Sequence, residues 1–150
     1  MTEYSSKHGT VSRPREQLYM AFTDMRFFRD MLPEDKKSYL EADYDTLRVT
    51  VQGFTIEVKV VGREPYSRIE LANGAGAPFA FNIILHFNEG PDASKTDFQI
   101  VVEADLNFVM KTMLGPKIKE GLDKIVDGLV DVSEGRVPEG MPADVRWPEA

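Results

Sequence analysis

Two histidines are the side chains of this sequence best suited to acid–base chemistry. His86 lies in a stretch of alternating residues, where it shares a face with Asn82 and Ile84, opposite the phenylalanines. Because side chains alternate between the two faces of a strand, we expect His86 on the outer face of a sheet. The alternative is a reversed face, on which Asn82 and His86 form a polar pair inside a cavity for general acid–base work. The alternation around His8 is weaker, and we expect no ligand contact there.

Acidic residues recur at spacings that invite comparison with metal sites. Asp123, Asp127 and Asp131 follow one another at four-residue intervals, which places them on one side of a helix. We interpret them as a solvent-exposed face, partly balanced by the Glu120–Lys124 spacing of four. The acidic residues of 89–97 lack the spacing of a calcium loop. We therefore predict neither a metal nor a cofactor.

In this sequence, Gly74 and Gly76 form the pattern most similar to a phosphate-binding glycine loop. They precede Pro78 and an alternating stretch, whereas a dinucleotide loop needs a helix N-terminus to hold the pyrophosphate. We predict a turn instead. The sequence has no Gly-x-Ser-x-Gly and no His-Glu-x-x-His motif. Four tyrosines could supply hydroxyl groups, but their spacing does not place them in a site: Tyr19, Tyr39, Tyr44 and Tyr66.

Composition excludes several classes of protein. The 150 residues are 42% hydrophobic and 29% charged, which is typical of one globular domain. A net charge of −7 gives the chain no electrostatic reason to bind nucleic acid or anionic lipid. There is no cysteine for a disulfide, a thiolate nucleophile or a zinc-thiolate site. The longest apolar stretch, 78–87, is too short to span a membrane, and we expect a cytoplasmic protein.

The elements that must position any site follow from hydrophobic periodicity. Period-two alternation predicts strands, and apolar residues at intervals of three and four predict helices. Expected strands are 3–11, 46–51, 54–60, 67–72, 79–87 and 98–106, and expected short helices lie between 14 and 32. Residues 33–43 are a polar connector. From 107 the period is helical as far as Gly135, with a kink or a fresh start at Pro116.

This order of elements predicts an α+β fold. Consecutive strands with short links favour an antiparallel meander. We predict a curved six-stranded antiparallel sheet wrapped around a long C-terminal helix, with two short helices between the first two strands. The domain spans 1–135, and 136–150 form a proline-containing tail that holds Trp147. Gly121 and Gly128 lie on one side of the helix, where we expect another segment to pass close by.

Three stretches resemble the SRPBCC superfamily, which includes START and Bet v 1-like domains and polyketide cyclases. Residues 11–24 (VSRPREQLYMAFTD) are similar to its opening strand, proline, helix and following aspartate. Residues 60–69 (VVGREPYSRI) are similar to its strand–proline–strand hairpin, and residues 115–129 to its closing helix. The resemblance covers about residues 3–134 and implies the helix-grip fold. It carries no catalytic motif.

The resemblance implies a cavity between sheet and helix that binds a small hydrophobic molecule, lipid-like or polyketide-like. We favour such binding, without chemistry, over an enzyme. Implied partners are a small apolar molecule and no nucleic acid, and a homodimer stays open. The implied cavity walls and floor are Phe54, Ile56, Val58, Phe81, Ile83, Leu85, Phe98, Ile100, Val102, Leu122, Ile125 and Leu129, with Phe27, Phe28 and Met31 near the mouth.

Three alternatives stay open at this point. The same apolar residues would simply fill a core if sheet and helix close tightly. A cyclase- or aromatase-like enzyme requires Asn82, His86 or a tyrosine to point inward. A ligand-free interaction protein would use outer apolar residues such as Ile84, together with Trp147.

Overall fold

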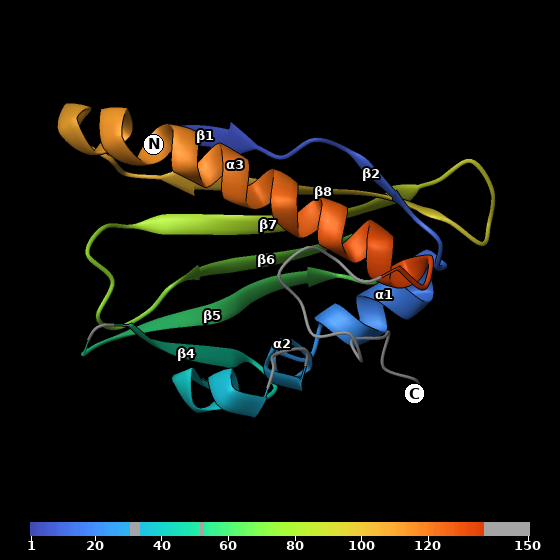
Figure 1. The fold of residues 1–150 in the computed structure, drawn as a ribbon, viewed down its shortest axis with the longest axis horizontal. Coiled ribbons are helices and arrows are strands. Elements are labelled where there is room, and N and C mark those ends of the chain that lie inside the picture. Colours follow the sequence, from blue (N-terminus) through green and yellow to red (C-terminus); the bar gives the residue numbers. More distant parts are fainter. Residues whose placement is uncertain (31–33, 52, 137–150) are drawn as a thin grey trace.

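The computed structural model describes residues 1–30, 34–51 and 53–136, without the side chains of Val51 and Phe54. One curved sheet is crossed by a long helix on its concave side (Figure 1). The elements in chain order are β1 (Thr2–Ser5), β2 (Gly9–Val11), α1 (Arg15–Phe22), α2 (Arg26–Asp30), the 3-10 helix η1 (Glu34–Tyr39), β3 (Leu40–Ala42), β4 (Thr46–Val51), β5 (Phe54–Glu64), β6 (Arg68–Asn73), β7 (Phe81–Glu89), β8 (Thr96–Ala104) and α3 (Phe108–Ser133).

The sheet is antiparallel, with strand order β1-β8-β7-β6-β5-β4-β3 and β2 also paired with β8. The predicted class and the closing helix are confirmed. The predicted count of six strands is wrong for two reasons. The connector 33–43 contains η1 and the edge strand β3, and the first strand is broken into β1 and β2.

A one-residue bulge causes that break. Ser5 pairs with Val101 and Gly9 pairs with Phe98, so four steps on one strand match three on the other. Such an extra residue bends a strand and interrupts its ladder. The Ser6 hydroxyl compensates by accepting a 2.9 Å hydrogen bond from the amide of Ile100.

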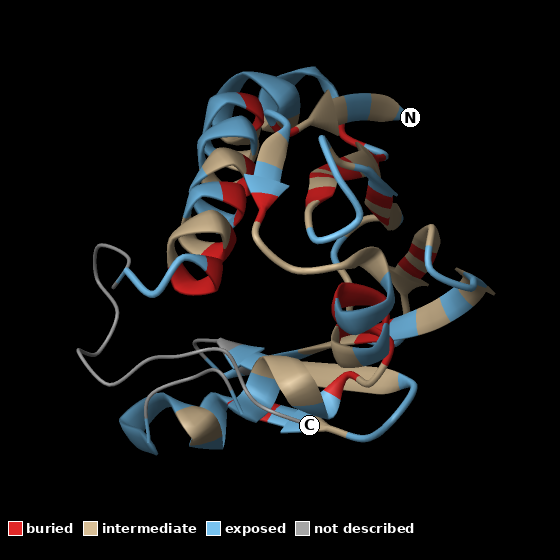
Figure 2. Cartoon of the chain, turned by 90° about the vertical axis from the view of Figure 1, so that its right-hand side faces the viewer, coloured by how far each residue is buried: buried red, intermediate tan, exposed pale blue. Residues whose placement is uncertain are grey.

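Helix α3 lies over the edge of the sheet formed by β1, β2 and β8. The Asn107 side chain caps its start by accepting from the amide of Met110 at 2.9 Å. The helix passes through Pro116, so the predicted fresh start at that proline is wrong. Buried residues of α3 lie on the side turned toward the sheet (Figure 2), and they are Gly115, Leu122, Val126, Leu129, Val132 and Ser133.

Two glycines show where α3 needs room. A Cβ atom on Gly9 of β2 would overlap the side chain of Val126, and one on Gly115 would lie 3.1 Å from the Tyr4 hydroxyl. By contrast, nothing lies within 4 Å of a Cβ on Gly121. The predicted close approach at Gly121 is therefore wrong, because the strands pass under a different side of the helix.

A hollow on the inner face of the sheet

The inner face of the sheet is built from aligned rows of apolar residues. Register places Leu71, Ile83 and Val102 side by side across β6, β7 and β8. A second row places Ile69, Leu85 and Ile100 one pleat further along. Because side chains alternate, the residues between these positions face outward. The alternation read from the sequence therefore assigns the two faces correctly.

Burial changes sharply along this inner face. On β7, Phe87 is fully buried and Leu85 is 5% exposed, whereas Ile83 and Phe81 are only half-buried. On β8, Phe98 is 1% exposed, whereas Val102 is half-buried. One end of the inner face is therefore fully covered by protein. The other end is covered only in part, because Leu71 and Ala104 in its rows are buried while their partners Ile83 and Phe81 are not.

Aromatic packing explains the filled end. Phe22 of α1 lies 5.9 Å from Phe87 and 5.7 Å from Phe98, measured between ring centroids. Tyr19, one turn earlier, meets Phe87 edge-on at 6.4 Å. These rings supply large apolar area and favourable edge contacts. Helix α1 thus occupies the space that remains open elsewhere.

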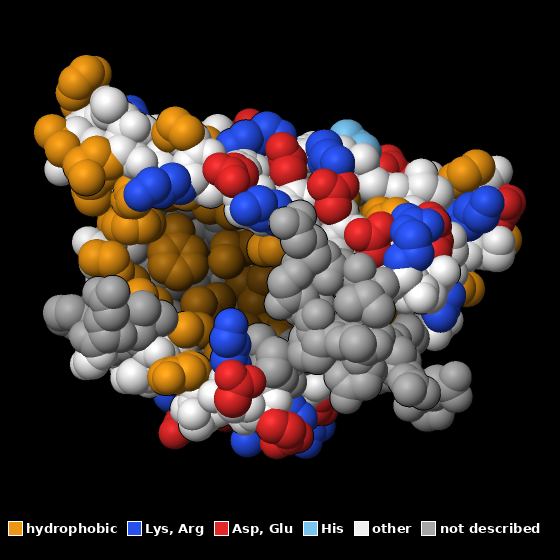
Figure 3. Space-filling model, viewed as in Figure 1, with side chains coloured by type: hydrophobic (Ala, Val, Ile, Leu, Met, Phe, Trp, Pro, Cys, Tyr) orange, Lys and Arg blue, Asp and Glu red, His pale blue; other side chains and the backbone are white. Residues whose placement is uncertain are grey.

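A hollow with an apolar floor lies at the other end, between α3 and the strands β4 and β5 (Figure 3). Half-buried apolar side chains face the interior at this end of the sheet. Their positions follow from the registers of β4 to β8 and from α3, and they are Leu47, Val49, Ile56, Phe81, Ile83, Val102 and Ile118.

One flank of α3 overhangs this hollow. The flank with Gly115 and Val126 packs on β1 and β2, at the sheet edge. At about 100° per residue, Ile118 and Ile125 lie on an adjacent flank, about 60–100° round the helix from Gly115 and Val126. Ile118 is half-buried against the core, and Ile125 is 56% exposed. The exposure of Ile125 is consistent with an apolar side chain at the rim of an open space.

The predicted cavity residues divide by how far they are buried. Those buried in the core are Val58, Leu85, Phe98, Ile100, Leu122 and Leu129, although Val58 pairs with Leu47 and Asn73 beside the hollow. Those that are half-buried or exposed beside the hollow are Ile56, Phe81, Ile83, Val102 and Ile125. The Phe54 side chain, Met31 and Trp147 lie outside what the structure describes.

The predicted mouth residues of α2 lie on the aromatic cluster. Phe27 and Phe28 are half-buried, with ring centroids 5.0 and 5.3 Å from that of Phe22. Each ring therefore has one side on the filled core. That they border the entrance of a ligand stays a prediction.

The candidate acid–base pair faces away from the interior. His86 pairs across the sheet with Arg68 and Gln99, and Asn82 pairs with Ala72 and Glu103, all on the outer face. Partial burial and then the nearby Arg68 charge lower the pKa of His86. The alternative of an inward Asn82–His86 pair is wrong, because the phenylalanines occupy the inner face.

The other polar side chains singled out from the sequence are either buried in the core or exposed on the surface. Tyr19 is buried in the core, while Tyr39, Tyr44 and Tyr66 are exposed. His8 is exposed and lies 3.0 Å from a carboxylate oxygen of Asp97. Gly76 adopts a φ of +81°, which confirms the predicted turn.

The acidic stripe of α3 ties the bulge after β1 to the helix. The Asp123 carboxylate accepts from the amide of Lys7 at 2.7 Å and from the Lys119 ammonium at 2.9 Å. These two contacts, with the side-chain bond to Lys119 as the larger cause, lower the pKa of Asp123. Lys7 also pairs with Asp127. Among the described residues, no group of three or more His, Cys, Asp or Glu side chains could hold a metal ion.

Two polar side chains of the inner face were missed by sequence reasoning. Asn73 continues the inner register of β6, and its side-chain oxygen accepts from the amide of Phe81 at 2.9 Å. Tyr4 pairs with Val102 and lies under α3 at Gly115. Its hydroxyl has no hydrogen-bond partner in the described part of the chain. The alternation of Thr2 and Tyr4 carries this signal, but the bulge at Ser6 obscures it.

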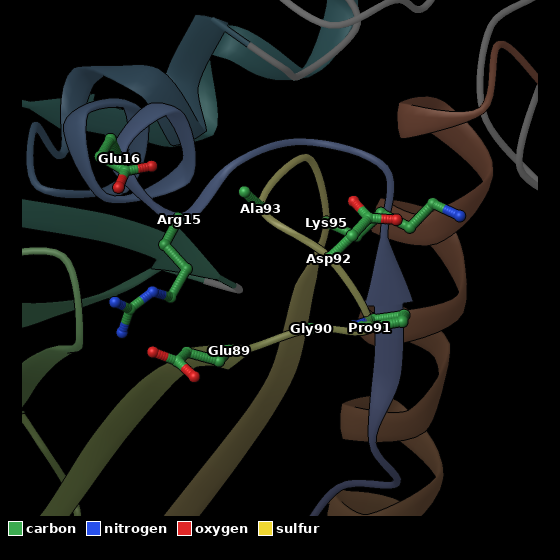
Figure 4. A pocket seen from close by; sticks show the side chains of 8 residues that line it. All are labelled: Arg15, Glu16, Glu89, Gly90, Pro91, Asp92, Ala93 and Lys95. Carbon is green, nitrogen blue, oxygen red and sulfur yellow. The ribbon is translucent and has the colours of Figure 1, made fainter.

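A separate pocket of about 420 Å³ lies between the start of α1 and the β7–β8 hairpin. Figure 4 shows the Arg15 and Glu89 side chains extending toward each other across it. Its other lining residues include Asp92 and Lys95, so charges of both signs meet there. This pocket does not suit an apolar ligand.

Solved structures share the fold at low sequence identity. Norcoclaurine synthase from Thalictrum flavum matches with a TM-score of 0.66 at 15% identity, over 86% of this chain and 84% of that one. A solution NMR structure from Thermobifida fusca matches with a TM-score of 0.68 at 11% identity, over 100% of both chains. The Aha1 dimer from Colwellia psychrerythraea matches with a TM-score of 0.54 at 12% identity, over 82% and 97%.

These likenesses define the fold as Bet v 1-like, a curved sheet closed by a C-terminal helix. No family model matches the sequence, and no curated protein matches it. Within the described residues, no helix is long and apolar enough to cross a membrane.

Proposed function

We propose that this protein binds a small hydrophobic molecule, lipid-like or polyketide-like, in the hollow between the inner sheet face and α3. The observation that carries this proposal is the burial gradient along β7, from Phe87 at 0% exposure to the half-buried Ile83 and Phe81. Half-buried apolar side chains in a concave surface gain free energy when a ligand covers their remaining exposed area, by about 25 cal/mol per Å².

The polar groups beside the hollow favour a ligand with one polar end. Tyr4 pairs with Val102 and lies against Gly115 of α3, with a hydroxyl that has no partner among the described residues. Asn73 offers an amide next to Phe81. A largely apolar site with a few polar groups is the usual composition of a small-molecule pocket. We assign Tyr4 and Asn73 the role of orienting such a ligand.

We further infer that the chain is a member of the SRPBCC superfamily, with residues 1–135 as the binding unit. The three similar stretches and the Bet v 1-like fold support this assignment. One structural neighbour is named a synthase. The hypothesis of a cyclase-like enzyme loses its main support, because the candidate acid–base pair Asn82 and His86 faces outward.

A pair of adjacent substitutions tests the proposal. Ile83→Trp places an indole in the hollow, and Ile84→Trp places the same group on the outer face. Binding of cis-parinaric acid, followed by fluorescence, is expected to weaken at least tenfold for Ile83→Trp and to stay unchanged for Ile84→Trp. Native mass spectrometry of the purified wild-type chain would show whether a ligand is retained.

Two results would contradict the proposal. Equal affinity of both variants for the probe would place binding elsewhere. The absence of saturable binding to wild-type protein, with correct folding shown by circular dichroism, would leave the hollow without a ligand.

A further inference from the structure

The start of α3 carries apolar side chains that pack on nothing. Phe108 is 82% exposed, Met113 is 65% exposed and Val109 is 61% exposed. This group, which we call the α3 tip, lies at the upper left of Figure 3. Three large apolar side chains exposed together in one place mark an interaction site more often than a scattered arrangement does.

The charge around the α3 tip differs from that of the whole protein. The net charge of the chain is −7, yet residues 106–119 contain three lysines and no acidic residue, with Asp105 and Glu120 as the acidic residues on either side. Lys119 pairs with Asp123 at 2.9 Å. Lys111 and Lys117 have no ion pair among the described residues. A lysine near an anionic membrane surface gains about 1 kcal/mol of attraction, so two lysines without an ion pair beside exposed apolar side chains favour such a surface.

The loop of residues 74–80 is also apolar and has no acidic residue. Residues 74–80, between β6 and β7, contain no charged residue, and Pro78 and Ala80 are exposed. The carbonyl of Ala80 accepts a 2.8 Å hydrogen bond from the amide of Asp105, just before α3. The end of the loop is therefore held next to the segment that leads into α3, with the exposed Asp105 between them.

The loop and the α3 tip border the open end of the hollow. Phe81 pairs with Ala104 at the end of β8, and the chain enters α3 four residues later. The half-buried side chains of the hollow and the exposed side chains of the α3 tip thus lie at the same end of the molecule.

We propose that the α3 tip and the 74–80 loop dock onto an anionic lipid bilayer, with Phe108, Val109 and Met113 entering the interface and Lys111 and Lys117 facing lipid phosphates. A second copy of the chain fits less well, because a symmetric interface uses the same patch twice and residues 106–119 bring no acidic side chain to pair with these lysines. Docking would bring the hollow to the membrane for ligand exchange, and this part of the proposal rests on the proposed function. The membrane contact itself rests on the exposed residues alone.

Vesicle flotation tests the docking with the full chain and no added ligand. Binding is expected to vesicles of 30% phosphatidylglycerol in phosphatidylcholine, and to fall strongly with pure phosphatidylcholine or added salt. Phe108→Ser with Met113→Ser should weaken binding at least tenfold. Lys111→Gln should weaken it about fivefold. The matched controls Met20→Ser, on exposed Met20 of α1, and Lys36→Gln should leave it unchanged.

Three results would overturn the docking proposal. They are no flotation with anionic vesicles, equal losses in the control variants, or a concentration-dependent dimer that the Phe108→Ser, Met113→Ser variant abolishes. Parinaric-acid binding in the same samples separates the two proposals, because the α3 tip variants should retain it. Loss of flotation with intact probe binding would leave the proposed function standing.

Discussion

The two ends of the inner sheet face are made of the same kinds of residue and behave differently. At the α1 end, Phe87 and Phe98 are closed off by Phe22. At the opposite end, Phe81 and Val102 have the same strand geometry, but they lie beside the hollow that α3 only overhangs, and they stay half-buried. The difference shows that apolar alternation fixes which face is inner, while the helices decide whether that face is filled.

Truncation of one phenylalanine at each end should give the largest contrast. Phe87→Ala removes a fully buried ring and should cost about 3–5 kcal/mol of unfolding free energy. Phe81→Ala removes a half-buried ring and should cost about 1–2 kcal/mol. Urea denaturation measures both. Equal costs would mean that the open end is packed as tightly as the filled end.

The two sides of α3 offer a second contrast. Gly9→Ala forces a methyl group into Val126 and should cost about 1–3 kcal/mol. Val126→Ala removes a buried side chain and has its own cost, but the double variant should lose less than the sum of the two single variants because the overlap is relieved. Gly121→Ala meets nothing within 4 Å and should stabilise the helix by about 0.5–1 kcal/mol. Thermal unfolding would decide, and a destabilised Gly121→Ala would show that this side of α3 is also packed.

Arg63 of β5 makes polar contacts with Thr23 and Asp45 at the filled end of the inner face. Its guanidinium donates to the Thr23 hydroxyl at 2.6 Å and to the Thr23 carbonyl at 2.8 Å, and it pairs with Asp45 at 2.8 Å. Arg63→Met should leave buried Thr23 acceptors unpaired and cost about 1–2 kcal/mol. Arg48→Met, at an ion pair of the outer sheet face, is the matched control and should change little in chemical denaturation.

The smallest expected effect is a pH dependence from His86. Burial lowers the pKa of His86 below its ordinary 6.5, so unfolding takes up a proton there. Stability from this group is full above pH 6.5 and is lost as the pH falls through the lower folded value. Melting temperature should therefore decline slightly less for His86→Gln than for wild type between pH 7 and 5. Identical slopes would contradict this assignment.

Much of the fold was predictable because its signals are local. Alternation over 79–87 and 98–106 gives β7 and β8 their inner faces, and the stripe of Leu122 and Leu129 gives α3 its buried side. The orientation of Arg63 was not predictable, because the register shift between Val60 and Gly62 adds one residue to β5. A shift of one residue turns every following side chain to the other face.

The open hollow was not predictable for a related reason. Whether Ile83 is covered depends on where α1 and α3 end in space, and no local pattern encodes that. The net charge of −7 was likewise a poor guide to the α3 tip, because charge acts locally over about 10 Å in salt solution. Tyr4 was missed because the bulge between Ser5 and Gly9 breaks the alternation of the predicted strand 3–11.

Methyl NMR during a titration with cis-parinaric acid tests the central claim most directly. With isoleucine methyl labels, Ile56, Ile83 and Ile118 report on the hollow, buried Ile69 reports on the filled end, and Ile84 reports on the outer face. We predict saturable shifts at the first three, with little change at Ile69 and Ile84. Shifts confined to Ile84, or no shifts in the hollow at saturating probe, would contradict a ligand site between the sheet and α3.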